Sequence, residues 1–277
     1  MRKMQNDTKE IIRRYYNRLD VKYAMFQYLN GREFALISPE NKGYPVRHIK
    51  INNVQGLTFW LENMGVGIRN VYNLYYSSGH YIRIPNRSGN LSKTINKDFW
   101  DSHHTFLKSR ELFIDVDSKT ASFEHTFLSA VLIKRFFDKY KAPYEIVFSG
   151  RGFHFKTPQY LTGIKEELNP NKEHNLYKIY FQILTELRNK YSDLIDCNVC
   201  DSRRLMKLPY SLAVYPNEIK QTFQFNSNEE FKRLKEEMLF PDYWKDKIYK
   251  RGRFIFNETG NFDKVLKVLE IDTPERL

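Results

Sequence analysis

The chain has 277 residues, a formal net charge of +12 at pH 7 and a hydrophobic fraction of 41%. This length and composition can fill the core of one large domain or two small ones, which excludes a fibrous or low-complexity chain. No apolar stretch reaches the about 18 residues of a membrane span, and the N-terminus lacks a signal-peptide core, so we expect a cytoplasmic protein with no membrane contact. The positive charge favours a polyanionic partner.

Segments with helical and β-type periodicity alternate along the chain, which predicts an α+β fold. The predicted helices span 5–29, 121–140 and 171–194, and the predicted strands span 33–39, 46–51, 70–85, 110–117 and 144–150. From Ser227 on, the sequence is charged and mostly helical in pattern. We therefore predict one domain over 1–226 and a helical C-terminal extension over 227–277.

Two acidic residues stand two positions apart in the β-type run "LFIDVDSK". Side chains at i and i+2 of a strand point to the same face, so Asp115 and Asp117 should emerge together while Ile114 and Val116 face the other way. Hard oxygen ligands on a rigid strand suit magnesium or manganese, and a pair of such cations can serve phosphoryl transfer. The alternative is that both acids are simply solvated at a strand end.

The segment "VFSGRGFHF" places polar residues around two glycines directly after a strand. Glycines permit a tight turn and the close approach of a phosphate to backbone N–H groups. If this element lies beside the acidic strand, Ser149, Arg151 and His154 line the same cleft, where arginine and histidine can bind phosphate oxygens. The competing interpretation is a glycine turn followed by a histidine of the core.

A basic run follows further along, in "DSRRLMKLPYS". Arg204 and Lys207, with Arg203, concentrate positive charge where a triphosphate or a nucleic-acid backbone would bind, although a solvated basic face has the same pattern. Two acids precede the run. A third carboxylate is what a two-cation site would still need, and Asp196 is favoured over Asp201 because an apolar approach like that of Asp115 precedes it.

The two cysteines, Cys197 and Cys200, are three positions apart, so a four-cysteine zinc site cannot be built. A mixed site with His103 or His104 stays open. The favoured interpretation is a pair of reduced thiols near the core.

The order of these motifs resembles the archaeo-eukaryotic primase superfamily, which includes replicative primases and the primase-polymerases of plasmids and phages. "LFIDVD" is similar to its first motif, "SGRGFH" to its second and "LIDCNVCDSRRLMKLP" to its third with the following basic segment. The resemblance covers about residues 65–215. It implies a small α/β unit packed against a sheet related to RNA-recognition domains.

The resemblance also assigns roles to the motif residues. Asp115, Asp117 and Asp196 would hold two divalent cations, Mg²⁺ or Mn²⁺, with Asp201 as the substitute for Asp196. The phosphates of the incoming nucleotide would be bound by Ser149, Arg151, His154, Arg204 and Lys207. Many relatives carry a zinc-binding segment between the second and third motifs, but residues 156–195 contain no cysteine, so zinc is not expected.

The expected function is therefore template-dependent nucleotidyl transfer, as a DNA primase or DNA polymerase. Its partners would be a single-stranded DNA template, a dNTP or NTP, and a helicase or another replication or defence domain. Two alternatives stay open. One is a metal-dependent glycosyltransferase that uses nucleotide sugars, and the other is a non-catalytic module that binds single-stranded nucleic acid.

Overall fold

The structure is a computed structural model. It describes residues 2–37, 46–65, 73–81, 107–117, 120–164, 173–201, 204–215, 218–245, 247–248, 251 and 253–271. Of the sequence motifs, His103, His104 and Arg203 lie outside these ranges.

The chain forms two compact units, and each draws on separate stretches of sequence. Unit 1 contains Met1–Ser77 and Leu205–Arg253, while unit 2 contains Ser78–Arg83, Gly89–Arg204 and Phe254–Leu277. These units are groupings by packing, and they do not test whether 227–277 is a separable extension. The predicted boundary near residue 226 therefore stays a prediction.

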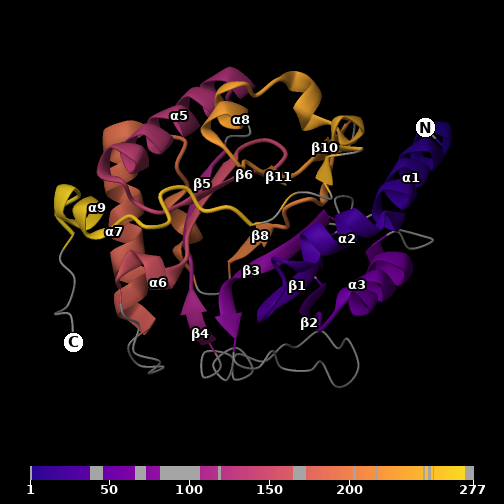
Figure 1. Ribbon diagram of the computed structural model, residues 1–277, viewed down its shortest axis with the longest axis horizontal. Coiled ribbons are helices and arrows are strands. Elements are labelled where there is room, and N and C mark those ends of the chain that lie inside the picture. Colours follow the sequence, from indigo (N-terminus) through magenta and orange to yellow (C-terminus); the bar gives the residue numbers. More distant parts are fainter. Residues whose placement is uncertain are drawn as a thin grey trace. The chain divides into compact units, whose positions relative to one another are not determined.

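Unit 1 combines an antiparallel sheet with short helices (Figure 1). The sheet has β1 (Arg32–Ile37) between β2 (Val46–Lys50) and the first half of β3 (Asn73–Tyr81), and β8 (Leu205–Lys207) also pairs with β3. The other elements of the unit are α1 (Arg2–Asn17), α2 (Leu19–Phe26), α3 (Val54–Trp60), the π-helical turn η1 (Leu61–Gly65), β9 (Leu212–Val214), β10 (Ile219–Gln221), β11 (Phe223–Gln224), α8 (Asn228–Lys232), η3 (Glu236–Leu239) and η4 (Pro241–Trp244).

The helix predicted over 5–29 is divided in two. Arg18, between α1 and α2, has an extended backbone with ψ of 127°. Its guanidinium donates to Asp20 and to the carbonyl oxygens of Trp244 and Lys245, which are remote in sequence. Because these acceptors come from tertiary packing, the hydrophobic periodicity of the segment could not indicate the break.

Unit 2 is built around the central strand β7 (Phe153–Thr157), which pairs antiparallel with β6 (Glu145–Phe148) and with β5 (Leu112–Val116). β4 (Leu107–Arg110) pairs with the last residues of β3. The helical elements of the unit are α5 (Phe123–Tyr140), α6 (Gln159–Thr162), α7 (Glu173–Tyr191), the 3-10 helix η2 (Cys197–Cys200) and α9 (Asp263–Val268). The predicted strand–helix–strand–helix order is confirmed in this unit.

Helix α5 covers one face of the sheet of unit 2. Its Ser122 N-cap accepts a hydrogen bond from the His125 N–H, as a helix start requires. Phe127 and Phe137 of the helix contact Phe153 and Phe155 of β7. Both β7 phenylalanines are fully buried, and each such burial contributes roughly 1.5–3 kcal/mol to stability. The alternation of the strand therefore directs His154 to the opposite face.

The segment that follows Phe254 belongs to unit 2. Phe256 forms an isolated antiparallel bridge with Tyr144, with hydrogen bonds in both directions. Their rings stack at 5.1 Å with an interplanar angle of 8°. The predicted helical tail therefore takes part in the core of this unit through a strand-like contact, and its helices are short.

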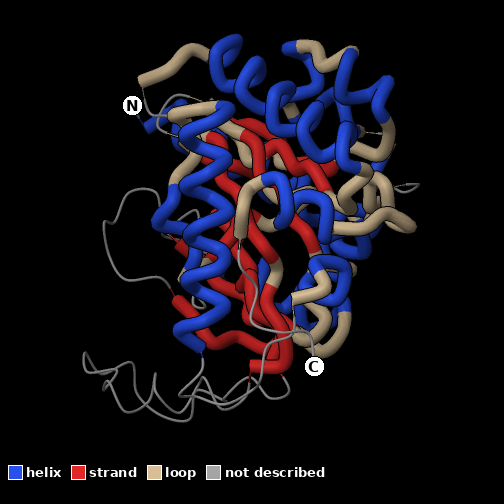
Figure 2. Tube along the Cα trace, turned by 90° about the vertical axis from the view of Figure 1, so that its left-hand side faces the viewer, coloured by secondary structure: helices blue, strands red, loops and turns tan. Residues whose placement is uncertain are grey.

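Helices and antiparallel sheets run through both units, as the colouring of Figure 2 shows, and the predicted α+β class is confirmed. None of the described helices combines the length and the apolar character that crossing a membrane demands.

Candidate active site

The pairing of β5 with β7 sets Asp115 directly opposite His154. The Nε2 atom of His154 lies 3.6 Å from Oδ1 of Asp115. The side chain of Asp115 is 24% exposed, whereas that of His154 is 7% exposed. The ring of Phe113, two residues before Asp115, stands edge-on to the imidazole at 4.8 Å and 89°. The acid and the histidine thus share the sheet face opposite α5.

Asp117 follows β5 directly and is exposed. Its charge raises the pKa of Asp115, which places the two carboxylates within electrostatic reach of each other. The sequence-based expectation that both acids come from the end of one strand agrees with this arrangement.

The turn between β6 and β7 lies against the end of β5. Ser149 N–H donates to the Gly152 carbonyl at 2.9 Å, and Gly152 N–H donates to the Ser149 hydroxyl oxygen at 3.3 Å. Gly150 has a φ of 108°, a conformation that side chains disfavour. A Cβ atom on Gly152 would lie 2.2 Å from the carbonyl oxygen of Val116 and 2.9 Å from Cβ of Asp117. The second glycine therefore permits the turn to touch the acidic strand.

Ser149 and Arg151 are the other predicted phosphate ligands of this turn. Ser149 is 6% exposed, and Arg151, between the two glycines, is exposed. The guanidinium of Arg151 is therefore on the surface and the hydroxyl of Ser149 is buried. Both residues belong to the turn whose Gly152 lies against Asp117.

The sequence left Asp196 and Asp201 as alternatives for the third carboxylate, and they occupy different surroundings. Ile195 bridges Val116 of β5, and Asp196 N–H donates to the carbonyl oxygen of Asp115 at 3.0 Å. Asp201 instead forms an ion pair with Arg204 at 3.2 Å. Asp196 raises the pKa of Asp115, and Asp201 is not among the causes of that shift. The geometry therefore favours Asp196.

Arg204 completes the group of charges. It lowers the pKa of Asp115, and its guanidinium donates to the carbonyl oxygen of Asn198 in η2. Its backbone carbonyl accepts from Ser78 N–H at 2.9 Å, so the residue is held by β3 as well. One arginine thus acts on Asp115 and forms an ion pair with Asp201.

Burial is the main cause of a raised pKa at Asp115, about 7, followed by the charges of Asp117 and Asp196. Arg204 offsets part of this rise. The Oδ1 atom of Asp115 is buried and has no hydrogen-bond partner. A partly buried carboxylate beside two others is costly to ionise unless a cation compensates it.

The donor chemistry fits divalent cations, because all three acids supply hard oxygen ligands and the buried Oδ1 of Asp115 needs a partner. Within the described ranges, however, no three His, Cys, Asp or Glu side chains already stand in a metal-binding arrangement. The carboxylate of Asp196 is engaged by the Asn198 N–H at 2.8 Å, where it caps η2. This hydrogen bond uses Oδ1 alone, so the cap does not by itself prevent Oδ2 of Asp196 from binding a cation.

The raised pKa of Asp115 predicts a pH dependence of stability. Between the ordinary value of 3.8 and about 7, the unfolded chain is ionised at this residue while the folded chain keeps the proton. The free energy of unfolding should therefore fall as the pH rises through this window. In chelator at about pH 8, Asp115→Asn should be more stable than the unmodified protein by on the order of 2 kcal/mol, after allowance for partial exposure.

Urea unfolding at about pH 5 and about pH 8 measures this effect. At the higher pH, added Mn²⁺ should make the unmodified protein more stable than Asp115→Asn, because the cation stabilises only the protein that keeps the carboxylate. An identical pH dependence in the variant and the unmodified protein would contradict the raised pKa.

Lys207, the remaining predicted phosphate ligand, belongs to unit 1. It lies in β8 opposite Tyr75, with its ammonium 4.6 Å from the centre of that ring. The two cysteines are in unit 2 and are buried and reduced, as predicted. Burial raises the pKa of Cys200 to about 12.

Two residues that hold the site were not identified from the sequence. Phe113 packs against His154, and the backbone N–H of Asn198 donates to the carboxylate of Asp196. The position of Phe113, two residues before Asp115 on one strand, was a usable signal for a shared face. No pattern pointed to Asn198, because its role depends on the 3-10 helix η2.

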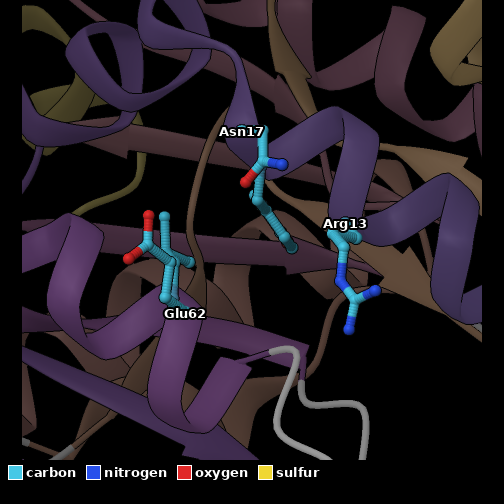
Figure 3. A pocket seen from close by; sticks show the side chains of 5 residues that line it. Arg13, Asn17 and Glu62 are labelled. Atoms are coloured by element: carbon cyan, nitrogen blue, oxygen red, sulfur yellow. The ribbon is translucent and has the colours of Figure 1, made fainter.

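A separate pocket of about 140 Å³ lies in unit 1 (Figure 3). Arg13 and Asn17 of α1 and Glu62 of η1 line it, together with Tyr16 and Leu61. None of the predicted site residues is among these, so this pocket is not part of the acidic site.

Comparison with known proteins gives evidence at the level of the fold. No family model matches the sequence, and the comparison with curated proteins gave no match. Among solved structures, the chain is similar to the polymerase domain of ligase D from Mycobacterium tuberculosis, determined in complex with DNA. The match has a TM-score of 0.51 and 13% identity, and it covers 96% of this chain and 93% of that domain. At this identity, the two proteins are alike in fold.

Proposed function

We propose that this chain adds nucleotides to a 3′-hydroxyl under the direction of a single-stranded DNA template. The observation that carries the proposal is the meeting of three sequence motifs in unit 2. Asp115 faces His154 across paired strands, Asp196 is hydrogen-bonded to the backbone of Asp115, and the two-glycine turn packs on Asp117. The fold likeness to a polymerase domain bound to DNA supports the same function.

The acids are assigned to cation binding. Asp115, Asp117 and Asp196 would hold two divalent cations, magnesium or manganese. When bound, such cations acidify the 3′-hydroxyl and neutralise charge on the triphosphate. The three carboxylates come from one strand end and one neighbouring segment, and the hydrogen bond from Asp196 N–H to the Asp115 carbonyl joins the two segments.

The cationic and polar residues are assigned to the triphosphate. Arg151 is exposed on the two-glycine turn and is suited to bidentate contact with a phosphate. His154 would donate to the phosphate nearest to Asp115, and Ser149 and Arg204 would contact the same group of oxygens. The sequence resemblance also assigns Lys207, in unit 1, to phosphate binding. Charge that develops on the leaving pyrophosphate is then offset by fixed cations.

A primer-extension assay tests the proposal. The reaction contains a labelled primer on a DNA template, dNTPs or NTPs, and Mg²⁺ or Mn²⁺. The primer should be extended by the nucleotide that the template specifies. The same reactions without primer decide whether the enzyme also starts strands. Extension that does not depend on the template, or no incorporation under any of these conditions, would overturn the proposal.

A stability measurement separates this function from transfer of a sugar. With Mn²⁺ present, a nucleoside triphosphate should raise the Tm more than a nucleotide sugar at the same concentration, because the arginines and His154 are assigned to three phosphates. The reverse ranking would favour a glycosyltransferase.

A further inference from the structure

Helix α7 presents an aromatic pair on its surface. Tyr177 and Phe181 are four residues apart, so they share one face of the helix. Their rings stack at 6.1 Å with an interplanar angle of 12°, and each residue is 39% exposed. Single exposed hydrophobic residues are common, but a stacked pair offers a continuous flat surface. We call these two residues the α7 aromatic pair.

Cations surround the α7 aromatic pair along the same helix. Lys178 is next to it, Arg188 lies two turns further on the same side, and both side chains are exposed. Lys190 is also exposed, and it pairs with Glu186 at 3.2 Å. Among the described exposed side chains of α7, positive charge therefore exceeds negative charge.

A second group of cations adjoins the end of this helix. The C-terminal ends of α5 and α7 lie side by side in unit 2, because Phe136 and Tyr191 are in contact at 4.9 Å (Figure 1). Arg135 and Lys139, one on each side of Phe136 along α5, are both exposed. Cations at helix C-termini interact favourably with the helix dipole. Arg135, Lys139, Arg188 and Lys190, on two touching helix ends, would also attract an anion, although Glu186 offsets the charge of Lys190.

We infer that the α7 aromatic pair, with these neighbouring cations, is a docking surface for single-stranded nucleic acid. Bases would stack on Tyr177 and Phe181 while the backbone phosphates follow Lys178, Arg188 and the joined helix ends. Every base has an apolar face, so such a surface holds a strand of any sequence. The inference rests on the proposed function, for which it supplies a second point of contact with the unpaired template.

The charge favours a nucleic acid over an apolar protein partner. A protein interface would be expected to surround exposed aromatic residues with mixed or apolar side chains, whereas the described exposed charges of α7, such as Lys178 and Arg188, are cationic. The chain as a whole carries a net charge of +12, which also favours a polyanion.

A double variant, Tyr177→Ala with Phe181→Ala, tests the inference in the full chain. Fluorescence anisotropy with labelled oligothymidylate should show a Kd raised by about tenfold or more, because each stacked base contributes roughly 1–3 kcal/mol. Tyr160→Ala is the matched control, since Tyr160 is 75% exposed in the same unit but is not part of the pair. Its Kd should be unchanged. Circular dichroism and urea unfolding verify that the variants are folded.

The cations give an independent measurement. Lys178→Gln with Arg188→Gln should reduce the slope of log K against log salt by about 1.4, because each phosphate contact with a single strand contributes about 0.7, while the aromatic variant should leave the slope unchanged. An unchanged Kd in the aromatic variant, or a change in sedimentation that shows loss of self-association instead, would overturn the inference.

The outcomes also separate this inference from the proposed function. A protein that extends primers but binds oligothymidylate equally well with and without the aromatic pair would retain the proposed function and lose the docking surface. A protein whose strand binding depends on the pair but which incorporates no nucleotide would keep the docking surface and lose the polymerase function.

Discussion

Asp115→Asn should lower the rate of template-directed incorporation by at least about a thousandfold, which corresponds to roughly 4 kcal/mol of transition-state stabilisation. Asp115 is the acid that the others surround, since Asp117 and Asp196 both act on its pKa and the backbone of Asp196 binds its carbonyl. The amide has the same shape and cannot supply a charged ligand. Single-turnover incorporation with Mn²⁺ measures the loss.

Asp193→Asn is the matched control for this experiment, because Asp193 is an exposed acid in the same unit, three residues before Asp196. It should keep full activity. Retained incorporation by a folded Asp115→Asn protein would show that the acidic site does not hold the reacting cations.

Of the substitutions that add one methyl group to the turn, Gly152→Ala is expected to reduce stability the most. The added Cβ would meet the Val116 carbonyl oxygen at 2.2 Å, and this neighbour is backbone that cannot rotate away. We expect a loss of at least about 2 kcal/mol of stability. The turn must also move away from Asp117, so incorporation should fall even where the protein remains folded. Urea unfolding and the extension assay together measure both effects.

Gly56→Ala supplies the comparison for the glycine change. Gly56 lies within α3, and an added Cβ there would meet Oδ1 of Asn53 at 3.4 Å, an ordinary contact. Because alanine favours a helix by up to about 1 kcal/mol over glycine, this variant should be as stable as the unmodified protein or more so. Equal stability of the two alanine variants would contradict the close packing of the turn.

The elements with strong local signals were predictable from the sequence. The apolar spacing of 121–140 predicted a helix, and α5 begins at Phe123 after the Ser122 cap and ends at Tyr140. The alternation in "FHF" sends His154 and the two phenylalanines to opposite sides of a strand, and the contacts of Phe153 and Phe155 with α5 agree with this pattern. These features depend on residues close together in the chain.

The features that define the site depend on pairing between distant segments. The alternation of side chains along the strand separates His154 from Phe153 and Phe155. Only the register of β5 with β7, however, sets His154 opposite Asp115. A shift of one residue would have reversed the faces. In the same way, the sequence favoured Asp196 over Asp201 only through its apolar approach, whereas the structure distinguishes them by a backbone hydrogen bond to Asp115 and an ion pair to Arg204.

The burial of the thiols has a practical consequence for spectroscopy. The chain has two cysteines, Cys197 and Cys200, and both are buried, with 8% and 3% exposure. At neutral pH a thiol with a pKa of about 12, as at Cys200, is almost wholly protonated and reacts slowly with maleimides. A single cysteine introduced at the exposed position of Tyr160 should therefore accept a fluorophore selectively in the otherwise native chain.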